Sequence, residues 1–319
     1  MKSWSMHFDN GRATLEPREA DKPQPKAGEL LVRVKAASLN RGEFIPPAPG
    51  ATTPPKASGN EAVGEVEAVG AGVSGFRAGD RVMGRASGGF AEFTIMNAIE
   101  TMQVPASMSF EDAAAVPLVF LVTYDMLVAQ GGLAKGEWLL VTGVTSGVGV
   151  ACAQLAALLG AKTIGTSGSP QKLEKLDIAL GIPTRKPDFA AQVLEATGGK
   201  GANLAVNNVG GTMFAECVKS LAYRGRLAIV GYMDGTFSAS IDLEAVHSKR
   251  LKIFGVSNKL RPAAERAETV AGFARDVLPA FADGRIRPMI DRVFPMAEAP
   301  AALAYMESDA QVGKIVLAA

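Results

Sequence analysis

The chain has 319 residues, 48% of them hydrophobic and 20% charged, and its 33 lysines and arginines nearly balance its 32 aspartates and glutamates, which leaves a formal net charge of +1. This composition excludes a disordered chain, which needs low hydrophobicity and a high net charge. A chain so close to neutral has no overall field to attract nucleic acid or an anionic membrane, so neither partner is expected. The length suits two domains.

Cys152 and Cys217 are the only cysteines. Both lie in apolar segments that are predicted to be helical, so we expect buried, reduced thiols and no disulfide framework, as is usual in the cytosol. The first residues lack the apolar core and cleavage site of a secretory signal. No run of about 18 apolar residues is free of charges or glycines, so we expect no membrane span and a cytoplasmic location.

Short strands are predicted for the first third of the chain. Residues 29–37 and 61–69 carry the alternation of half-buried strands, and shorter strands are expected at 81–83 and 90–96. The glycine-rich turns between them favour a small β-barrel. Residues 46–55 contain five prolines and predict an irregular loop, because proline lacks an N–H group and has a fixed φ.

A helix interrupted by Pro117 is predicted from Ser109 to about residue 130, and Ser109 with Asp112 resembles a capping box. From Glu137 strands and helices alternate, which predicts a parallel sheet with helices on both faces. The expected strands lie near residues 138–142, 162–166, 202–207, 226–231 and 251–256. The expected helices between them lie near residues 147–159, 170–180, 188–197 and 212–222. A long helix at 262–283, a strand at 291–294, a helix at 297–307 and a strand at 314–317 follow.

The clearest ligand signal is the glycine-rich turn between the strand predicted at 138–142 and the helix predicted at 147–159. Small residues there let the backbone approach a pyrophosphate, and the helix N-terminus offers free N–H groups and the positive end of a dipole. A strand–turn–helix context favours a dinucleotide site over a glycine-rich turn without a ligand. The residues expected at the cofactor are Gly143, Ser146, Gly147 and Val148.

The end of the strand predicted at 162–166 indicates which dinucleotide binds. An NAD site usually has an Asp or Glu there, whereas this chain has no carboxylate between Ser167 and Lys172. Ser167, Ser169, Lys172 and a helix N-terminus can bind a 2′-phosphate, which favours NADPH over NADH. Alternatively, Ser169 is only an N-cap before Pro170, and the two interpretations are compatible.

Further segments occur in a characteristic order: residues 36–43, 59–64, 79–82, 88–93, 208–211, 225–231 and 313–317. With the glycine-rich turn they resemble, over essentially the whole chain, the medium-chain dehydrogenases/reductases of the zinc-independent quinone oxidoreductase group, which includes zeta-crystallin. The resemblance implies an α/β protein with a GroES-like β-barrel domain (residues 1–118 and 259–319) and a Rossmann domain with a doubly wound parallel sheet (119–258). NADPH would lie in the cleft between them.

The resemblance also implies a homodimer in which the Rossmann sheets pair edge to edge through the strand around residues 251–255. Zinc-dependent relatives use an early Cys and His as ligands, but here the Cys position falls in residues 38–40 and the His position is Asn60. His7, expected on an N-terminal strand, and His247, expected in a polar helix or loop, are not placed to replace them. Because a catalytic zinc needs about three suitable protein ligands, no metal is expected.

The resemblance places Asn40 and Thr123 beside the nicotinamide as catalytic candidates, and Asn40, Phe44 and Asn60 at the substrate. From the residues alone, Asn40 is equally a turn-stabilising residue, Thr123 a helix residue bonded back to a carbonyl, and Asn60 a hydrogen-bonded spacer. These alternatives stay open at the level of sequence.

The resemblance implies further cofactor contacts, and ligands of parallel sheets bind at the carboxyl ends of strands. Tyr232 is expected to stack on the cofactor or to cover its site, and Lys314 either contacts a phosphate or is solvated. The remaining expected contacts are Asn208, Val209, Phe254 and Val256.

Without a Lewis acid, simple alcohol oxidation is disfavoured, whereas a conjugated acceptor spreads the charge that arrives with hydride onto a distant oxygen. We therefore predict NADPH-dependent hydride transfer to a quinone or an α,β-unsaturated carbonyl, with the proton supplied by solvent. One alternative is a dedicated enone/alkenal or enoyl-thioester reductase. Another is a non-catalytic NADPH-binding protein, such as a redox sensor or a crystallin-like protein.

Overall fold

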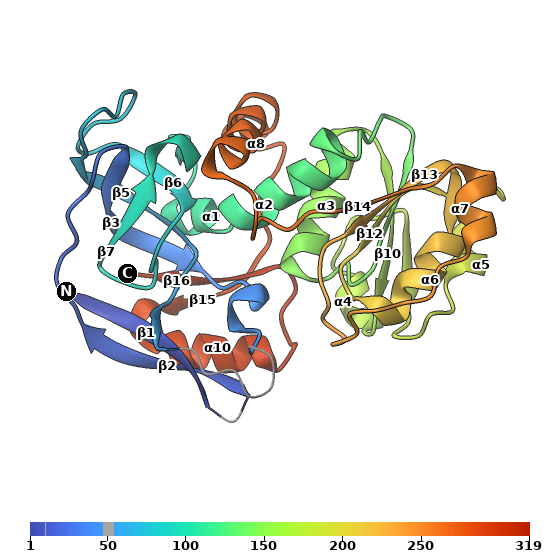
Figure 1. Ribbon diagram of the computed structural model, residues 1–319, viewed down its shortest axis with the longest axis horizontal. Helices are drawn as coiled ribbons and strands as arrows, with labels where there is room; N and C mark the ends of the chain where they lie inside the picture. Colours follow the sequence, from blue (N-terminus) through green and yellow to red (C-terminus); the bar gives the residue numbers. More distant parts are fainter. Residues whose placement is uncertain (10, 47–53) are drawn as a thin grey trace. The chain divides into compact units, whose positions relative to one another are not determined.

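The computed structural model describes residues 1–9, 11–46 and 54–319, which fold into two compact units (Figure 1). Unit 1 comprises Met1–Leu121 and Pro262–Ala319, and unit 2 comprises Val122–Arg261. The irregular loop predicted at 46–55 lies mostly outside the described residues.

The main sheet of unit 1 has seven strands, with β7 (Phe93–Asn97) paired to β3 beside the path β15-β16-β3-β5-β6-β8. The strands on this path are β15 (Ile290–Pro295), β16 (Lys314–Ala318), β3 (Glu29–Ser38), β5 (Glu61–Val69), β6 (Arg81–Arg85) and β8 (Thr101–Gln103). The strands predicted at 29–37, 61–69 and 81–83 are confirmed. Residues of β3 and β5 belong to one buried core.

A second, smaller sheet of unit 1 has the order β2-β1-β4, with β1 (Lys2–Asp9), β2 (Arg12–Glu19) and β4 (Lys56–Ala57). His7 lies on β1, as expected, and its Nε2 atom lies 2.8 Å from the Thr14 hydroxyl. Figure 1 shows β1, β2 and α10 (Ala299–Glu307) close together, and Tyr305 of α10 packs against the same core.

The helix predicted from Ser109 to about residue 130 with an interruption at Pro117 is confirmed, because two short helices are followed directly by the π-helical turn η3 (Asp125–Ala129). The Ser109 hydroxyl accepts a hydrogen bond from the Asp112 N–H at 3.0 Å, which confirms the predicted cap of α1 (Phe110–Ala114), and α2 begins at Pro117 (Pro117–Tyr124). The single helix predicted at 262–283 is wrong, because α8 (Ala263–Asp276) and α9 (Leu278–Ala282) are separated at Val277. Pro279 is the second residue of α9 and lacks the N–H group that a continuous helix needs.

Unit 2 contains a six-stranded, wholly parallel sheet with the order β11-β10-β9-β12-β13-β14. Its strands are β9 (Trp138–Val141), β10 (Lys162–Ser167), β11 (Leu180–Pro183), β12 (Ala202–Asn207), β13 (Leu221–Ile229) and β14 (Lys252–Gly255). Its helices are α3 (Gly147–Leu158), α4 (Pro170–Leu173), α5 (Ala190–Ala196), α6 (Gly211–Lys219) and α7 (Leu243–Lys249). The predicted alternating α/β fold is confirmed.

One expectation for unit 2 is wrong. The helix predicted at 170–180 ends at Leu173, and Leu180–Pro183 forms the edge strand β11, in which Pro183 is tolerated because an edge strand need not donate on both sides. The strand predicted at 226–231 is confirmed as part of β13, which begins earlier, at Leu221, and ends at Ile229. Cys152 and Cys217 are buried free thiols on α3 and α6, as predicted. None of the described helices combines the length and the apolar character that crossing a bilayer requires.

The close approach of β3 and β5 requires Gly64. A Cβ atom built at this glycine would lie 2.0 Å from the carbonyl oxygen of Arg33. We expect Gly64→Ala to lower the free energy of unfolding by about 1–3 kcal/mol, because overpacking forces the backbone to shift.

Urea unfolding of the purified variant measures this loss. Gly42→Ala is the matched control in unit 1, because nothing lies within 4 Å of the added methyl group. Similar losses in the two variants would contradict the packing argument.

Candidate functional site

The glycine-rich turn after β9 holds the start of α3 tightly. Ser146 is the N-cap residue, and its hydroxyl accepts a hydrogen bond from the Gly149 N–H at 3.1 Å. Gly143 has a φ of +65°, and a Cβ atom at Gly149 would lie 2.6 Å from the Gly143 carbonyl oxygen, so both positions require glycine. The N–H groups of Gly147 and Val148 belong to the first helical turn, where no intrahelical acceptor exists.

The end of β12 is bound to this turn. The Thr142 hydroxyl accepts hydrogen bonds from the N–H groups of Asn208 at 3.0 Å and Val209 at 3.3 Å. The Asn208 side-chain amide donates to the Ser146 hydroxyl at 2.7 Å. Because β9 has β10 on one side and β12 on the other, these residues lie where the strand order reverses, at the carboxyl ends of the strands. The structure therefore brings together several of the predicted cofactor residues.

The residues after β10 form a polar turn without a carboxylate. The Ser167 hydroxyl accepts a hydrogen bond from the Ser169 N–H at 3.3 Å, and the Ser169 hydroxyl accepts one from the Lys172 N–H at 3.4 Å. The predicted cap at Ser169 with Pro170 behind it is confirmed. The helix that follows has only four residues, so its dipole is a weaker phosphate-binding element than the longer predicted helix would have been.

Arg185 is a cation that the sequence analysis missed. Ser167 of β10 pairs with Pro183 of β11, and Arg185 follows two residues later. Its guanidinium packs against Gly168, because a Cβ atom at that glycine would lie 2.1 Å from Nε. The signal that would have identified Arg185 is its place shortly after a strand that pairs with β10. That strand was not predicted, because a helix was expected at 170–180.

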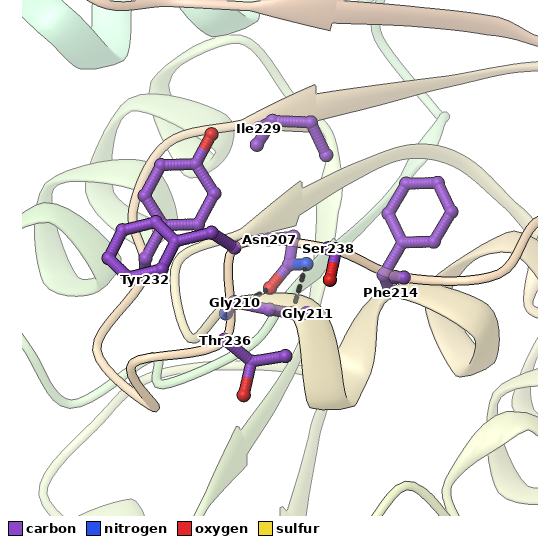
Figure 2. A pocket seen from close by; sticks show the side chains of 10 residues that line it. Asn207, Gly210, Gly211, Phe214, Ile229, Tyr232, Thr236 and Ser238 are labelled. Atoms are coloured by element: carbon purple, nitrogen blue, oxygen red, sulfur yellow. Dashed lines mark hydrogen bonds between the residues drawn. The ribbon is translucent and has the colours of Figure 1, made fainter.

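The loop after β13 borders a pocket of about 190 Å³ within unit 2 (Figure 2). Figure 2 shows Tyr232 and Phe214 on opposite sides of Asn207, whose side-chain amide donates to the Gly210 carbonyl at 2.8 Å. This volume is below the roughly 300–1,000 Å³ of small-molecule sites, so the pocket is not by itself a cofactor site. Tyr232 is 44% exposed and remains available to a ligand.

The other candidates of unit 2 are less exposed. Val256 is buried, and its N–H donates to the Ile229 carbonyl at 3.3 Å, whereas Phe254 on β14 is half-buried. Thr123 is fully buried, with its hydroxyl 3.7 Å from the Cys152 sulfur. Burial raises the pKa of the Cys152 thiol to about 12, which keeps it protonated and unreactive at neutral pH.

A buried polar cluster in unit 1 is centred on Glu61, whose side chain has no exposed surface. One carboxylate oxygen accepts hydrogen bonds from Ser38 at 2.5 Å, from Asn40 at 2.7 Å and from Lys314 at 2.9 Å. The other oxygen accepts one from the Leu118 N–H at 2.7 Å. Donors from β3, β16 and α2 therefore converge on a single side chain. We call Ser38, Asn40, Glu43, Glu61 and Lys314 the carboxylate cluster.

Lys314 is buried within unit 1, which decides against one of its two interpretations. Only 5% exposed, it is not the solvated lysine of the alternative interpretation, which is wrong. Its ammonium donates to Glu61, to the Leu39 carbonyl at 2.9 Å and to the Asn40 side-chain oxygen at 2.8 Å. All three N–H donors are thus used inside unit 1, and a phosphate contact would require one of them to be released.

Asn40 binds both carboxylates of the cluster. Its amide nitrogen donates to Glu61 and, at 3.0 Å, to Glu43. Both amide hydrogens are therefore occupied, so a substrate carbonyl would have to displace a carboxylate. The Asn60 N–H donates to the second Glu43 oxygen at 3.2 Å, while Phe44 is buried in the core of unit 1.

Glu43 was not singled out from the sequence, yet it is the most perturbed carboxyl of the cluster. Burial raises the pKa of Glu43 from 4.5 to about 7. The hydrogen bond from Asn40 and the charge of Lys314 oppose this rise in pKa, and the negative charge of Glu61 adds to it. In the sequence, Glu43 lies three residues after Asn40 and Glu61 directly follows Asn60. This proximity was the available signal, but the burial of the two carboxyl groups cannot be predicted from it.

The raised pKa of Glu43 has a consequence for stability. Because the folded protein holds this proton more tightly than the unfolded chain, its contribution is fully present below pH 4.5 and is lost as the pH rises through about 7. We expect the free energy of unfolding of the wild type to fall across this window by roughly 3 kcal/mol more than that of Glu43→Gln, which cannot ionise.

Urea unfolding at intervals between pH 4.5 and pH 8 measures the difference. Glu65→Gln is the control, since Glu65 lies on β5, its side chain is 42% exposed, and it pairs with Lys35 at 3.2 Å. Parallel pH curves for the wild type and Glu43→Gln would refute the assignment.

Two family models match the chain. The model described as alcohol dehydrogenase GroES-like domain matches residues 26–106, and the model described as zinc-binding dehydrogenase matches residues 147–271. Despite the second description, no three His, Cys, Asp or Glu side chains are grouped as a metal site within residues 1–9, 11–46 and 54–319. From the sequence, the zinc-ligand positions are expected within residues 38–40 and at Asn60, and none of these residues is a Cys or His.

Among curated proteins, the chain is 30% identical over 313 residues to a phenolphthiocerol/phthiocerol polyketide synthase protein of Mycobacterium tuberculosis. The alignment covers 95% of this chain but only 14% of that much longer protein. The similarity therefore concerns one segment of the synthase and not the whole enzyme.

Three solved structures resemble the chain along its full length. Mycobacterial Rv1454c complexed with NADPH has a TM-score of 0.88, and a mycobacterial quinone oxidoreductase has one of 0.85, both at 27% identity and with 100% of both chains covered. An NAD-dependent alcohol dehydrogenase has a TM-score of 0.83 at 28% identity, again over 100% of both chains. The fold, the family models and these similarities together show that the chain belongs to the medium-chain dehydrogenase/reductase superfamily, in its zinc-independent quinone oxidoreductase group.

Proposed function

We propose that this oxidoreductase is an NADPH-dependent, zinc-independent reductase of quinones or α,β-unsaturated carbonyls. The observation that carries the proposal is the turn after β9, where Ser146, Asn208 and the first-turn amides of α3 lie beside Gly149, which admits no Cβ atom. Such a cradle fits a pyrophosphate. When bound, the dinucleotide supplies the hydride donor that the chain itself lacks.

The protein holds the cofactor through residues of unit 2. Gly143, Ser146, Gly147 and Val148 would hold the pyrophosphate. Asn208, Val209, Tyr232, Phe254 and Val256 would contact the remainder, as in the family. Lys314 is left out of this set, because its ammonium is committed to the carboxylate cluster.

The preference for NADPH follows from the turn after β10. Ser167, Ser169 and Lys172 offer two hydroxyls and a cation, and Arg185 packed on Gly168 adds a guanidinium suited to phosphate. No carboxylate lies between residues 167 and 172 to repel a 2′-phosphate. The complex of mycobacterial Rv1454c with NADPH supports this choice, and NADH is the alternative that the NAD-dependent relative represents.

The proposed substrate class follows from the chemistry of the residues that we expect beside the substrate. Asn40, Phe44 and Asn60 are the residues that we place near the substrate, and none of them is a Lewis acid. A conjugated acceptor suits such a site because its negative charge is delocalised. The similarity to a polyketide synthase favours a second candidate, an enoyl-thioester reductase.

Two expectations from the sequence remain proposals. Thr123 would act beside the nicotinamide, although its buried hydroxyl lies against Cys152. A homodimer would form through β14, which is the edge strand of its sheet and leaves one side of its backbone free for pairing.

The cofactor assignment is tested at Arg185. We expect Arg185→Ala to weaken NADPH binding by about 10- to 100-fold, because a charge-assisted bond to phosphate is worth about 1.5–3 kcal/mol. NADH binding should change little, since NADH lacks the 2′-phosphate. Fluorescence titration of both nucleotides provides the measurement.

Lys186→Ala is the matched control, because it removes one positive charge from the neighbouring exposed position. Equal weakening of NADPH and NADH by Arg185→Ala, or no weakening of either, would remove Arg185 from the site.

The reaction is tested by NADPH oxidation against a panel of quinones, enones and enoyl thioesters. We expect turnover with at least one conjugated acceptor, none with simple ketones, and no loss of rate after treatment with a strong zinc chelator. Turnover confined to thioesters would select the second candidate. Binding of NADPH without oxidation by any acceptor would instead indicate a sensor or structural protein.

A further inference from the structure

The carboxylate cluster contains two buried carboxyl groups but only one buried cation. Glu61 and Lys314 have 0% and 5% exposure and form an ion pair at 2.9 Å. Glu43, at 8% exposure, has no cation of its own. A cluster with both carboxyls ionised would bury an uncompensated negative charge, which is costly in a poorly solvated site.

The hydrogen bonds decide which of the two carboxyls carries the extra proton. Glu61 accepts four hydrogen bonds, one of them from an ammonium group. Glu43 accepts only two, both from neutral amides and both longer, at 3.0 and 3.2 Å. Charged donors and more donors favour the ionised form, so the proton is expected on Glu43.

No other charged group on the described elements around Glu43 compensates it. Arg41, in the same short helical turn η1 (Arg41–Phe44), donates to Asp309 and to the Met306 carbonyl. Glu61 on β5 and Lys314 on β16 are the charges that act on Glu43. Residues 47–53, which follow η1 in the chain, include no titratable side chain.

We propose that Glu43 is the acid that supplies the proton to the reduced acceptor, a role that rests on the proposed reductase function. Glu43 is linked through Asn40 to Glu61 and through its second oxygen to the N–H of Asn60, and these two asparagines are the residues placed at the substrate. Two neighbouring carboxyl groups in different surroundings commonly take different roles, one holding a proton that it can donate and the other providing a fixed charge.

The proton balance of this step is simple. Reduction by hydride adds two electrons to the conjugated acceptor and leaves a hydroquinone monoanion or an enolate. The O–H bond of Glu43 breaks, its proton forms a new bond to the acceptor anion, and the Glu43 carboxylate is then reprotonated by solvent. Asn40 and Lys314 hold the neighbouring charge of Glu61 fixed while the charge of Glu43 alternates.

The test combines kinetics with a direct measurement of the proton. NADPH oxidation is followed between pH 5.5 and pH 9 with a quinone and an enone for the wild type, Glu43→Gln, Glu43→Asp and the half-buried control Glu65→Gln. NADPH affinity is measured for each by fluorescence titration. Infrared difference spectra of the same proteins between the ends of this pH range record the band of a protonated carboxylic acid.

We expect kcat of the wild type to fall as the pH rises above about 7, and Glu43→Gln to lower kcat at pH 6 by about 10²- to 10⁴-fold without changing NADPH affinity. Glu43→Asp should restore part of the rate and shift the pH profile. The infrared band should disappear at high pH in the wild type and be missing from Glu43→Gln.

Two outcomes overturn the proposal in distinguishable ways. An active Glu43→Gln variant with the wild-type pH profile would exclude Glu43 as the acid and leave the reductase function intact. A wild type that reduces no acceptor at any pH would overturn the proposed function and the acid role together. A wild-type difference spectrum without a carboxylic-acid band would exclude proton exchange at Glu43, even where the variants do not fold.

Discussion

The buried carboxylate of Glu61 is the interaction on which unit 1 depends. It accepts hydrogen bonds from side chains of β3 and β16 and from the backbone at the start of α2, segments that lie far apart in the sequence. A charge that is so fully buried is tolerated only with such a complete set of partners. The same bonds fix the orientation of Asn40 and leave Glu43 with fewer hydrogen-bond partners than Glu61. The contacts that hold unit 1 together therefore also determine which carboxyl is proposed to donate the proton.

Unit 2 differs from unit 1, because the dinucleotide proposed for it would be held mainly by backbone groups. The turn after β9 is narrow enough that Gly149 has no room for a Cβ atom, and Thr142 binds the two amides that follow β12. Both strand ends are thereby fixed in the free protein, which would lower the entropic cost of binding. Under the proposed function, side chains are needed mainly at the two ends of the dinucleotide.

The sequence predicted what depends on local pattern. Ser109 and Ser169 were recognised as caps because capping depends on neighbouring residues, and the strands at 29–37 and 61–69 followed from their alternation. The strand at Leu180–Pro183 was not predicted, because its four residues include a glycine and a proline. Without this strand, there was no reason to expect Arg185 beside the turn after β10. The environments of Glu43 and Lys314 could not be predicted, because each depends on charges that the fold brings from distant segments. The break before Pro279 is a local effect as well, because the proline lacks the N–H group that would continue α8.

The contact between Arg185 and Gly168 couples two positions of the turn. A side chain at 168 would occupy the space of the guanidinium, and the exposed arginine would have to move aside. If Arg185 binds the 2′-phosphate as proposed, a substitution at 168 would change the choice of dinucleotide by displacing the arginine, without touching the dinucleotide itself.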